Sequence, residues 1–248
     1  MALRAPKLLA LLLALCLADP SAATVVIDNF EQGAISVIDG SDTPGVTFQE
    51  QSGLDTANVV GGVRLAGATA TGEVGAPGSG IPGTATALLA PLPLVPDAVL
   101  FESTTAGTFN FFYDGNADGA PQTTDGALDL DLTGRDAFLV SVLATLGTPE
   151  LRVTVWDSDS NSNSAFHVAA NGANIIPFSE FSGIDFTDVQ TIRLAVSEVV
   201  SLNAISISEF LAVPEPGTAL LLAAGLVGLT ARRRMARQGR SEAPLQLE

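Results

Sequence analysis

Hydrophobic and polar residues alternate in short segments through the middle of the chain. Between Thr191 and Val196 the residues Thr, Arg and Ala alternate with Ile, Leu and Val, a period of two that predicts a half-buried strand. Other short segments rich in β-branched or aromatic residues, most bounded by Gly, Asn, Asp or Pro, predict further strands at residues 24–27, 59–65, 109–113, 137–143, 151–156 and 205–210. No long helical period appears between them. Regularly spaced short strands predict an all-β fold, an antiparallel β-sandwich of jelly-roll type.

Two stretches between these strands predict loops. Residues 67–96 are rich in Gly, Ala, Pro and Thr and end in three prolines spaced two and three residues apart, so we expect a long loop or an excursion at a sheet edge. Residues 157–164 contain only Asp, Ser and Asn, a composition typical of a hairpin loop. All 12 phenylalanines lie between residues 30 and 210, and we expect Phe30, Phe101, Phe109, Phe111 and Phe138 in the core.

The two ends of the chain differ from this middle part. Residues 1–23 combine Arg4 and Lys7 with an apolar run and small residues at 21–23, the pattern of a secretory signal peptide. Cys16, the only cysteine, lies in that run, so the exported part can form no disulfide and depends on its core or on a bound metal. We expect one exported domain at residues 24–212, a C-terminal signal at 213–240 and a short tail at 241–248.

The C-terminal signal has three parts. A box of Val213, Pro214, Glu215 and Pro216 is followed by an apolar run at residues 219–231 and then by a basic cluster that begins with Arg232, Arg233 and Arg234. The prolines end the preceding strand and leave an extended hinge. The apolar run suits a lipid environment, although at about 1.5 Å per residue it is shorter than the roughly 30 Å hydrocarbon core. The arginines hold the C-terminus on the cytoplasmic side.

These residues, in this order, resemble the PEP-CTERM sorting signal. The resemblance implies export across the inner membrane of a Gram-negative bacterium, transient anchoring by a C-terminal transmembrane helix, and processing by an exosortase, a membrane protease-transpeptidase. It further implies a final location at the cell surface or in the medium, in association with exopolysaccharide or biofilm. Family members usually end soon after the arginines, whereas residues 241–248 continue this chain.

The exported part resembles galactose-binding-like and carbohydrate-binding jelly-roll domains more diffusely. The similarity lies in an Asp-Asn-Phe-Glu-Gln-Gly segment at 28–33, the turn from Asp131 to Gly134, and an Ile-Pro-Phe segment at 176–178. It implies the fold more than a ligand. The leading hypothesis is therefore an exported surface or matrix protein, and the alternative is a carbohydrate-binding module that recognises exopolysaccharide.

Charge and residue types narrow the function further. All but four of the 27 acidic residues lie between Asp28 and Glu209, where only four arginines oppose them. Such a surface repels phosphate backbones, so we expect no nucleic-acid partner. His167 is the only histidine, no nucleophile motif is present, and no pair of carboxylates stands out as a glycosidase pair. The sequence thus predicts a protein that is not an enzyme.

One loop matches a calcium-binding pattern. Asp114, Asn116 and Asp118 alternate before Gly119, and Asp125 occupies the twelfth position. The spacing turns alternate side chains toward one hard cation, and the glycine allows the sharp turn. We expect calcium here as a cofactor, with an ordinary Asp/Asn/Gly loop as the alternative.

Strand alternation predicts a candidate glycan-binding surface. Within residues 151–156, Arg152 and Trp156 fall on the polar side, and Arg193 lies on the polar side of its own strand. If the two polar sides form one face, these three residues provide an aromatic platform and hydrogen-bond donors for a sugar. Packing of an arginine on the Trp156 ring is the structural alternative.

Overall fold

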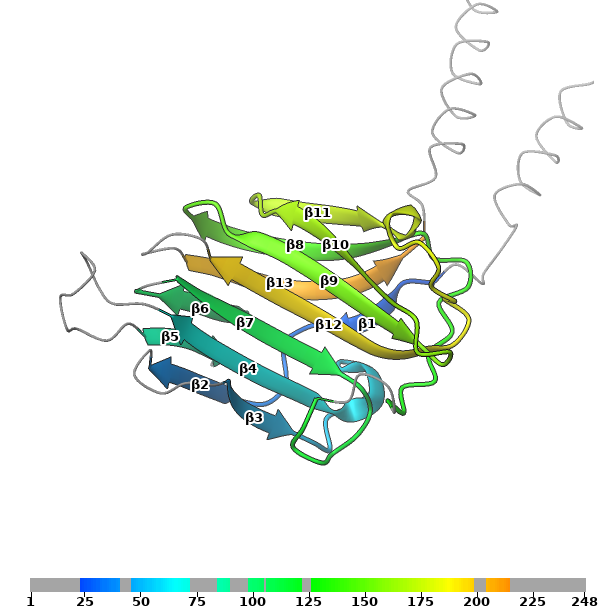
Figure 1. The fold of residues 1–248 in the computed structure, drawn as a ribbon, viewed down its shortest axis with the longest axis horizontal. Coiled ribbons are helices and arrows are strands. Elements are labelled where there is room, and N and C mark those ends of the chain that lie inside the picture. Colours follow the sequence, from blue (N-terminus) through cyan, green and yellow to red (C-terminus); the bar gives the residue numbers. More distant parts are fainter. Residues whose placement is uncertain are drawn as a thin grey trace, which may run out of the picture.

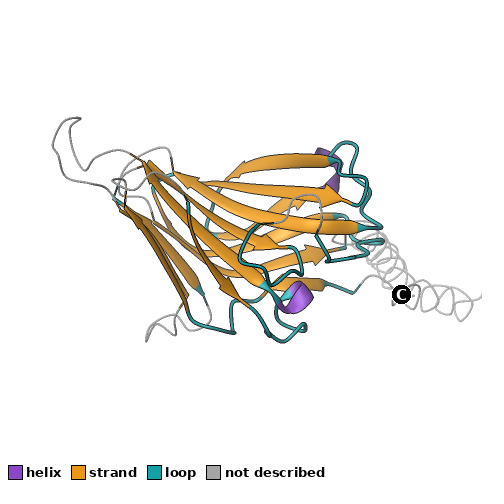
Figure 2. Cartoon of the chain, turned by 60° about the horizontal axis from the view of Figure 1, so that its bottom comes forward, coloured by secondary structure: helices purple, strands orange, loops and turns teal. Residues whose placement is uncertain are grey.

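The computed structural model describes residues 23–40, 46–71, 84–89, 98–104, 106–121, 126–198 and 204–214. These residues form two β-sheets that pack face to face, and every pairing between their strands is antiparallel (Figures 1 and 2). The antiparallel β-sandwich predicted from the alternating pattern is confirmed.

The sheets contain seven and six strands. In the seven-stranded sheet the order is β11 (Gly172–Pro177), β8 (Ala137–Leu146), β13 (Ala204–Val213), β6 (Val99–Ser103), β5 (Thr84–Leu89) and β2 (Ile35–Gly40), with β1 (Val25–Asp28) also paired to β13. In the six-stranded sheet the order is β10 (Ser162–Val168), β9 (Glu150–Asp157), β12 (Val189–Glu198), β7 (Ala106–Tyr113), β4 (Arg64–Thr71) and β3 (Thr47–Gln51).

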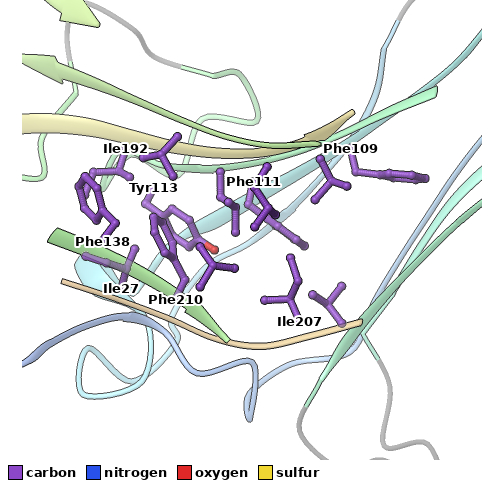
Figure 3. Packing of buried hydrophobic residues seen from close by; sticks show 14 of the residues in the cluster. Ile27, Phe109, Phe111, Tyr113, Phe138, Ile192, Ile207 and Phe210 are labelled. Carbon is purple, nitrogen blue, oxygen red and sulfur yellow. The ribbon is translucent and has the colours of Figure 1, made fainter. Parts of the chain in front are cut away.

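Aromatic rings fill the space between the sheets. Phe109, Phe111 and Tyr113 alternate inward from β7, and they face Phe138 and Phe210 of the opposite sheet (Figure 3). The rings pack at tilted or edge-on angles, for example Phe138 against Phe210 at 5.5 Å between centroids, the geometry that aromatic pairs prefer. This burial is the main stabilising contribution in a domain without disulfides.

A buried polar network ties the first strand into the sandwich. Arg64 and Asp28 are fully buried and form an ion pair of 2.7 Å. The hydroxyl of Tyr113 donates to the same Asp28 oxygen at 3.0 Å, and Gln51 Oε1 accepts from Arg64 Nη2 at 2.8 Å. The amide of Phe30 donates to the other Asp28 oxygen at 2.8 Å. Every member is paired, as burial of charge requires.

The prediction of a strand at residues 59–65 is wrong for the first part of this segment. Residues Val60–Gly62 form a 3₁₀ turn, and β4 begins only at Arg64. Gly61 and Gly62 have φ of 69° and 68°, a left-handed conformation that strand residues do not adopt. A Cβ on Gly61 would lie 2.8 Å from the Leu128 side chain, so the turn also depends on a close approach.

The loop expected over residues 67–96 is also wrong where the structure describes it. Residues 67–71 belong to β4 and 84–89 to β5, while 72–83 and 90–97 lie outside the described residues. Composition predicted a loop here because alanine has low strand propensity. In the structure, buried alanines line the inward face of both strands and leave volume for the phenylalanines of β6 and β7: Ala66, Ala68, Ala70, Ala85 and Ala87.

The hairpin expected at residues 157–164 is confirmed. Strands β9 and β10 are paired from Trp156, opposite Ser162, to Glu150, opposite Val168. The amide of Asp157 donates to the Asn161 carbonyl at 3.1 Å, and that of Ser160 to the Asp157 carbonyl at 3.1 Å. The turn is shorter than the polar run suggests, because residues 162–164 belong to β10.

Candidate functional site

The three residues predicted to bind a ligand share the outer face of the six-stranded sheet. Arg152 and Trp156 point away from the core on β9, since Leu151, Val153 and Val155 between and beside them are buried. Arg193 of β12 lies directly opposite Thr154, the residue between Arg152 and Trp156. Strand register, together with alternation, therefore brings the three side chains to one side of the sheet.

Arg152 and Arg193 each stack on a phenylalanine of a neighbouring strand, on the side that faces away from the other arginine. The Arg152 guanidinium carbon lies 4.6 Å from the ring centroid of Phe166, its directly opposite residue on β10. The Arg193 guanidinium carbon lies 5.6 Å from the centroid of Phe112, its opposite residue on β7. These are cation–π distances. No arginine among the described residues stacks on Trp156.

On the side toward the other arginine's strand, each arginine is paired with a small residue. Arg152 is opposite Ala195 on β12, and Arg193 is opposite Thr154 on β9. The two arginines are thus diagonal neighbours on adjacent strands, close enough for long side chains to interact. We call this region the arginine face: Arg152, Thr154, Trp156, Phe166, Arg193, Ala195 and Phe112.

The guanidinium groups of the arginine face have few protein partners. Nη2 of Arg152 donates to Ser164 Oγ at 3.2 Å, but Nε of Arg152 and Nε of Arg193 are buried without an acceptor among the described residues. The ion pairs of the described residues join Arg64 to Asp28 and His167 to Glu180, so neither arginine of this face takes part in one. A buried donor without an acceptor costs about 1–3 kcal/mol.

The charges of the two arginines affect one another. Burial and the neighbouring Arg152 charge lower the pKa of the Arg193 guanidinium, although it stays protonated at neutral pH, as arginine does in proteins. A carboxylate near this region, that of Glu150 on β9, accepts from the Ser197 hydroxyl at 3.4 Å. Glu150 lies two residues before Arg152, on the same side of β9, so the arginine face carries two positive charges with one carboxylate beside them.

The predicted calcium loop is described only in part, because Asp125 lies outside the described residues. Asp114 is buried, and its carboxylate accepts from the Asn116 amide at 3.0 Å. The exposed Asp118 accepts from the Ala120 amide at 3.1 Å. The described residues contain no group of three or more His, Cys, Asp or Glu side chains arranged to hold a metal. Calcium binding stays a prediction.

A buried aspartate that the sequence analysis assigned to a loop organises the β9–β10 hairpin. The carboxylate of Asp157 accepts from the Asn161 amide at 2.9 Å, from Asn161 Nδ2 at 3.1 Å and from the Asp185 amide at 3.0 Å. Burial acts to raise the pKa of Asp157, but these hydrogen bonds outweigh it and lower that pKa. Asp157 thus fixes the end of the strand that carries Trp156.

The sorting signal begins where the sandwich ends. Val213 is the last residue of β13, the strand that pairs with β8, β6 and β1, and Pro214 follows it. Glu215, Pro216 and the arginines 232–234 lie outside the described residues, as do the signal peptide and the apolar run at 219–231. In the part of the chain that is described, no helix has the length and apolar character to cross a membrane.

Sequence comparison identifies this end of the chain. Residues 212–234 match the PEP-CTERM protein-sorting motif, which confirms the predicted sorting signal and implies exosortase as its processing partner. The motif indicates export with a C-terminal membrane-anchoring signal. It covers only this short part of the chain, and no curated protein sequence matches the chain significantly.

Solved structures resemble the sandwich at low sequence identity. A family 11 carbohydrate-binding module from Clostridium thermocellum, in complex with a β-1,3-1,4-mixed-linked tetrasaccharide, is 13% identical, with a TM-score of 0.36 over 78% of this chain and 97% of the module. A family 12 xyloglucanase from Bacillus licheniformis is 10% identical, with a TM-score of 0.40 over 72% of this chain and 99% of the enzyme. Similarity at this level assigns no ligand or reaction to the chain.

Sequence reasoning identified three residues of the arginine face but not their aromatic partners. Phe112 was not assigned to either side of its strand, and Phe166 belongs to a strand that was not predicted at all. Because side chains alternate along the strand at 109–113, Phe112 could have been placed on the face of the sheet away from the inward Phe111. Nothing local to residue 166 shows that it lies opposite Arg152.

Proposed function

We propose that this chain is an exported, non-enzymatic surface protein, sorted through its C-terminal signal by an exosortase, whose sandwich domain binds extracellular polysaccharide through the arginine face. The observation that carries the first part is the PEP-CTERM motif at residues 212–234. The arginine face supports the second part. The host would be a Gram-negative bacterium, and the protein would reside at the cell surface or in its exopolysaccharide matrix.

The position of the motif suits release of an intact domain. The motif begins at residue 212, within the last two residues of β13, and every other described strand precedes it in the chain. Cleavage after the Pro214–Pro216 box would therefore remove the anchor without removing a strand. The domain would keep its core and its arginine face when it reaches the surface.

The arginine face has the composition of a glycan-binding surface. Trp156 is partly exposed beside Thr154 and opposite Thr191, and an exposed phenylalanine, Phe166 at 51%, lies on the next strand. Aromatic faces pack on sugar rings, while arginine and hydroxyl donors pair with the sugar oxygens. The charged groups that dominate this face are two arginines, which bind and orient but serve poorly as acid or base at neutral pH.

Mass spectrometry of the protein from the envelope and the medium of its native host tests the sorting. A mature form that starts near Thr24 and ends near Pro214–Pro216 is the expected result. An unprocessed chain that ends at Glu248 and stays in the membrane would contradict exosortase processing, while leaving polysaccharide binding open.

A pull-down with the exopolysaccharide of that host tests the binding. Wild-type protein should co-sediment with the polymer, and Trp156→Ala should lose most of this binding, because the aromatic platform is removed. Ile175→Ala is the matched control, since Ile175 is an exposed apolar residue, at 43%, on the other sheet. Equal retention of both variants would remove Trp156 from the site.

A further inference from the structure

The arginine face contains two cations that form no ion pair with a described residue, although the protein is rich in acidic residues. The exported part carries four arginines against most of the 27 acidic residues of the chain. Arg64 has an ion pair within the fold, but Arg152 and Arg193 have none among the described residues, and Nε of each is buried without an acceptor. Both Nε atoms are buried, so an anion would contact these partly exposed arginines through their terminal Nη groups.

The phenylalanines hold the two guanidinium groups in place. Phe166 and Phe112 flank the arginines on their outer sides, at 4.6 and 5.6 Å from the guanidinium carbons. Stacking fixes the plane of a guanidinium and leaves the N–H groups at its edge free. The side chains therefore lose little conformational freedom when an anion binds, which favours binding.

The residues between the two arginines have small side chains. Ala195 lies opposite Arg152, and Thr154 lies opposite Arg193. Both are buried, so no bulky side chain at these positions separates the two guanidinium groups. Two adjacent like charges repel, and a single carboxylate between them would remove that repulsion while accepting from both. Arginine–carboxylate contacts of this kind are among the strongest hydrogen bonds of proteins.

We infer that the ligand of the arginine face is an acidic polysaccharide, one carboxylate of which is bound between Arg152 and Arg193 while Trp156 and Phe166 contact its sugar rings. The inference rests on the proposed function. The net charge of −16 favours a polymer with widely spaced carboxylates over a densely charged one. Charges farther apart than about 8 Å are largely screened at physiological ionic strength, so a sparsely charged polymer meets little repulsion from the rest of the surface.

Calorimetric titration with a matched pair of glycans tests the inference. The probes are gellan oligosaccharides, which contain glucuronate, and the same oligosaccharides after reduction of the carboxyl groups, which turns glucuronate into glucose. We expect the full chain in detergent to bind the acidic form and to bind the reduced form at least ten-fold more weakly. Arg152→Gln and Arg193→Gln should each weaken binding of the acidic form roughly ten-fold or more and weaken binding of the reduced form by a clearly smaller factor.

Arg135→Gln is the matched control, because it removes the same charge from another partly exposed arginine, whose guanidinium donates to the carbonyls of Ala23 and Thr133. Equal binding of the two glycan forms would overturn the inference and leave polysaccharide binding intact. An equal loss in Arg135→Gln would also overturn it, since nonspecific attraction would then explain the preference. Binding of neither form, nor of the host polymer, would overturn the proposed function itself.

Discussion

Arg64 and Arg193 are both strand arginines of the six-stranded sheet, yet they have opposite surroundings. Arg64 points between the sheets, where Asp28, Gln51 and the carbonyl of Gln32 accept from its guanidinium. Arg193 points outward and has no hydrogen-bond acceptor for its Nε among the described residues. Inside the sandwich a charge is stable only when every donor is matched. On the outer face an unmatched Nε persists, and because Arg193 as a whole is partly exposed, the rest of its guanidinium can contact a ligand.

The largest expected effect comes from breaking the internal network. Arg64→Met leaves the carboxylate of Asp28 buried without its cation, which should lower the free energy of unfolding at neutral pH by about 3–5 kcal/mol. Urea unfolding followed by tryptophan fluorescence measures the change. Arg135→Met, at a partly exposed arginine without an ion pair among the described residues, should change it by less than about 0.5 kcal/mol.

The pH dependence of that variant sharpens the test. Burial raises the pKa of Asp28, although the neighbouring Arg64 acts to lower it. A carboxyl group with a raised pKa binds more protons in the folded state than in the unfolded state, so its contribution to stability improves as the pH falls. The deficit of Arg64→Met relative to wild type should therefore shrink below neutral pH. A deficit that grows on acidification would contradict this account of Asp28.

Removal of the hairpin aspartate should have a smaller effect with the opposite pH dependence. Asp157→Ala leaves the amides of Asn161 and Asp185 without their acceptor and should cost about 2–3 kcal/mol at neutral pH. Because hydrogen bonds lower the pKa of Asp157, its contribution is complete above the unfolded value of 3.8 and is lost as the pH falls through the lower folded value. Unfolding curves of wild type and variant should therefore approach one another at strongly acidic pH. Asp159→Ala, in the same turn but exposed, serves as control.

The stacking of Arg152 on Phe166 should contribute less again. Phe166→Ala removes an exposed ring and its cation–π contact, so we expect a loss of about 0.5–1 kcal/mol in thermal or urea unfolding. Val168→Ala, at a 66% exposed position on the same strand, is the control. A loss near 3 kcal/mol would show that Phe166 supports the fold rather than the guanidinium.

The smallest effect on stability is expected at the arginine that faces outward. Arg193→Met removes a donor that has no acceptor, and the methionine side chain can still pack on Phe112, so the free energy of unfolding should fall by no more than about 0.5 kcal/mol. The same urea curves measure it. If Arg193→Met cost as much as Arg64→Met, the contrast between the two arginines would be lost and Arg193 would be a structural residue.

Parts of the candidate site could be predicted from the sequence, since they depend on local pattern. Alternation put Arg152 and Trp156 on one side of β9 and Arg193 on the polar side of β12, and the structure brings these sides together. Phe112 could not be placed by residue type alone, because a phenylalanine on an outer face is indistinguishable in that respect from one between the sheets. The buried alanines of β4 and β5 were misassigned to a loop, because their inward position depends on the phenylalanines of other strands.

The sequence by itself determined the all-β class, the polar and apolar side of most predicted strands, and the sorting signal, because each depends on residues close together in the chain. The tertiary structure decided which strands are neighbours and in which register. Only that register places Arg152 opposite Phe166 and Ala195, and Arg193 opposite Phe112 and Thr154. The physical reason is that hydrogen-bonded pairing joins residues far apart in sequence, and a shift by one position would turn each strand's side chains to the other face.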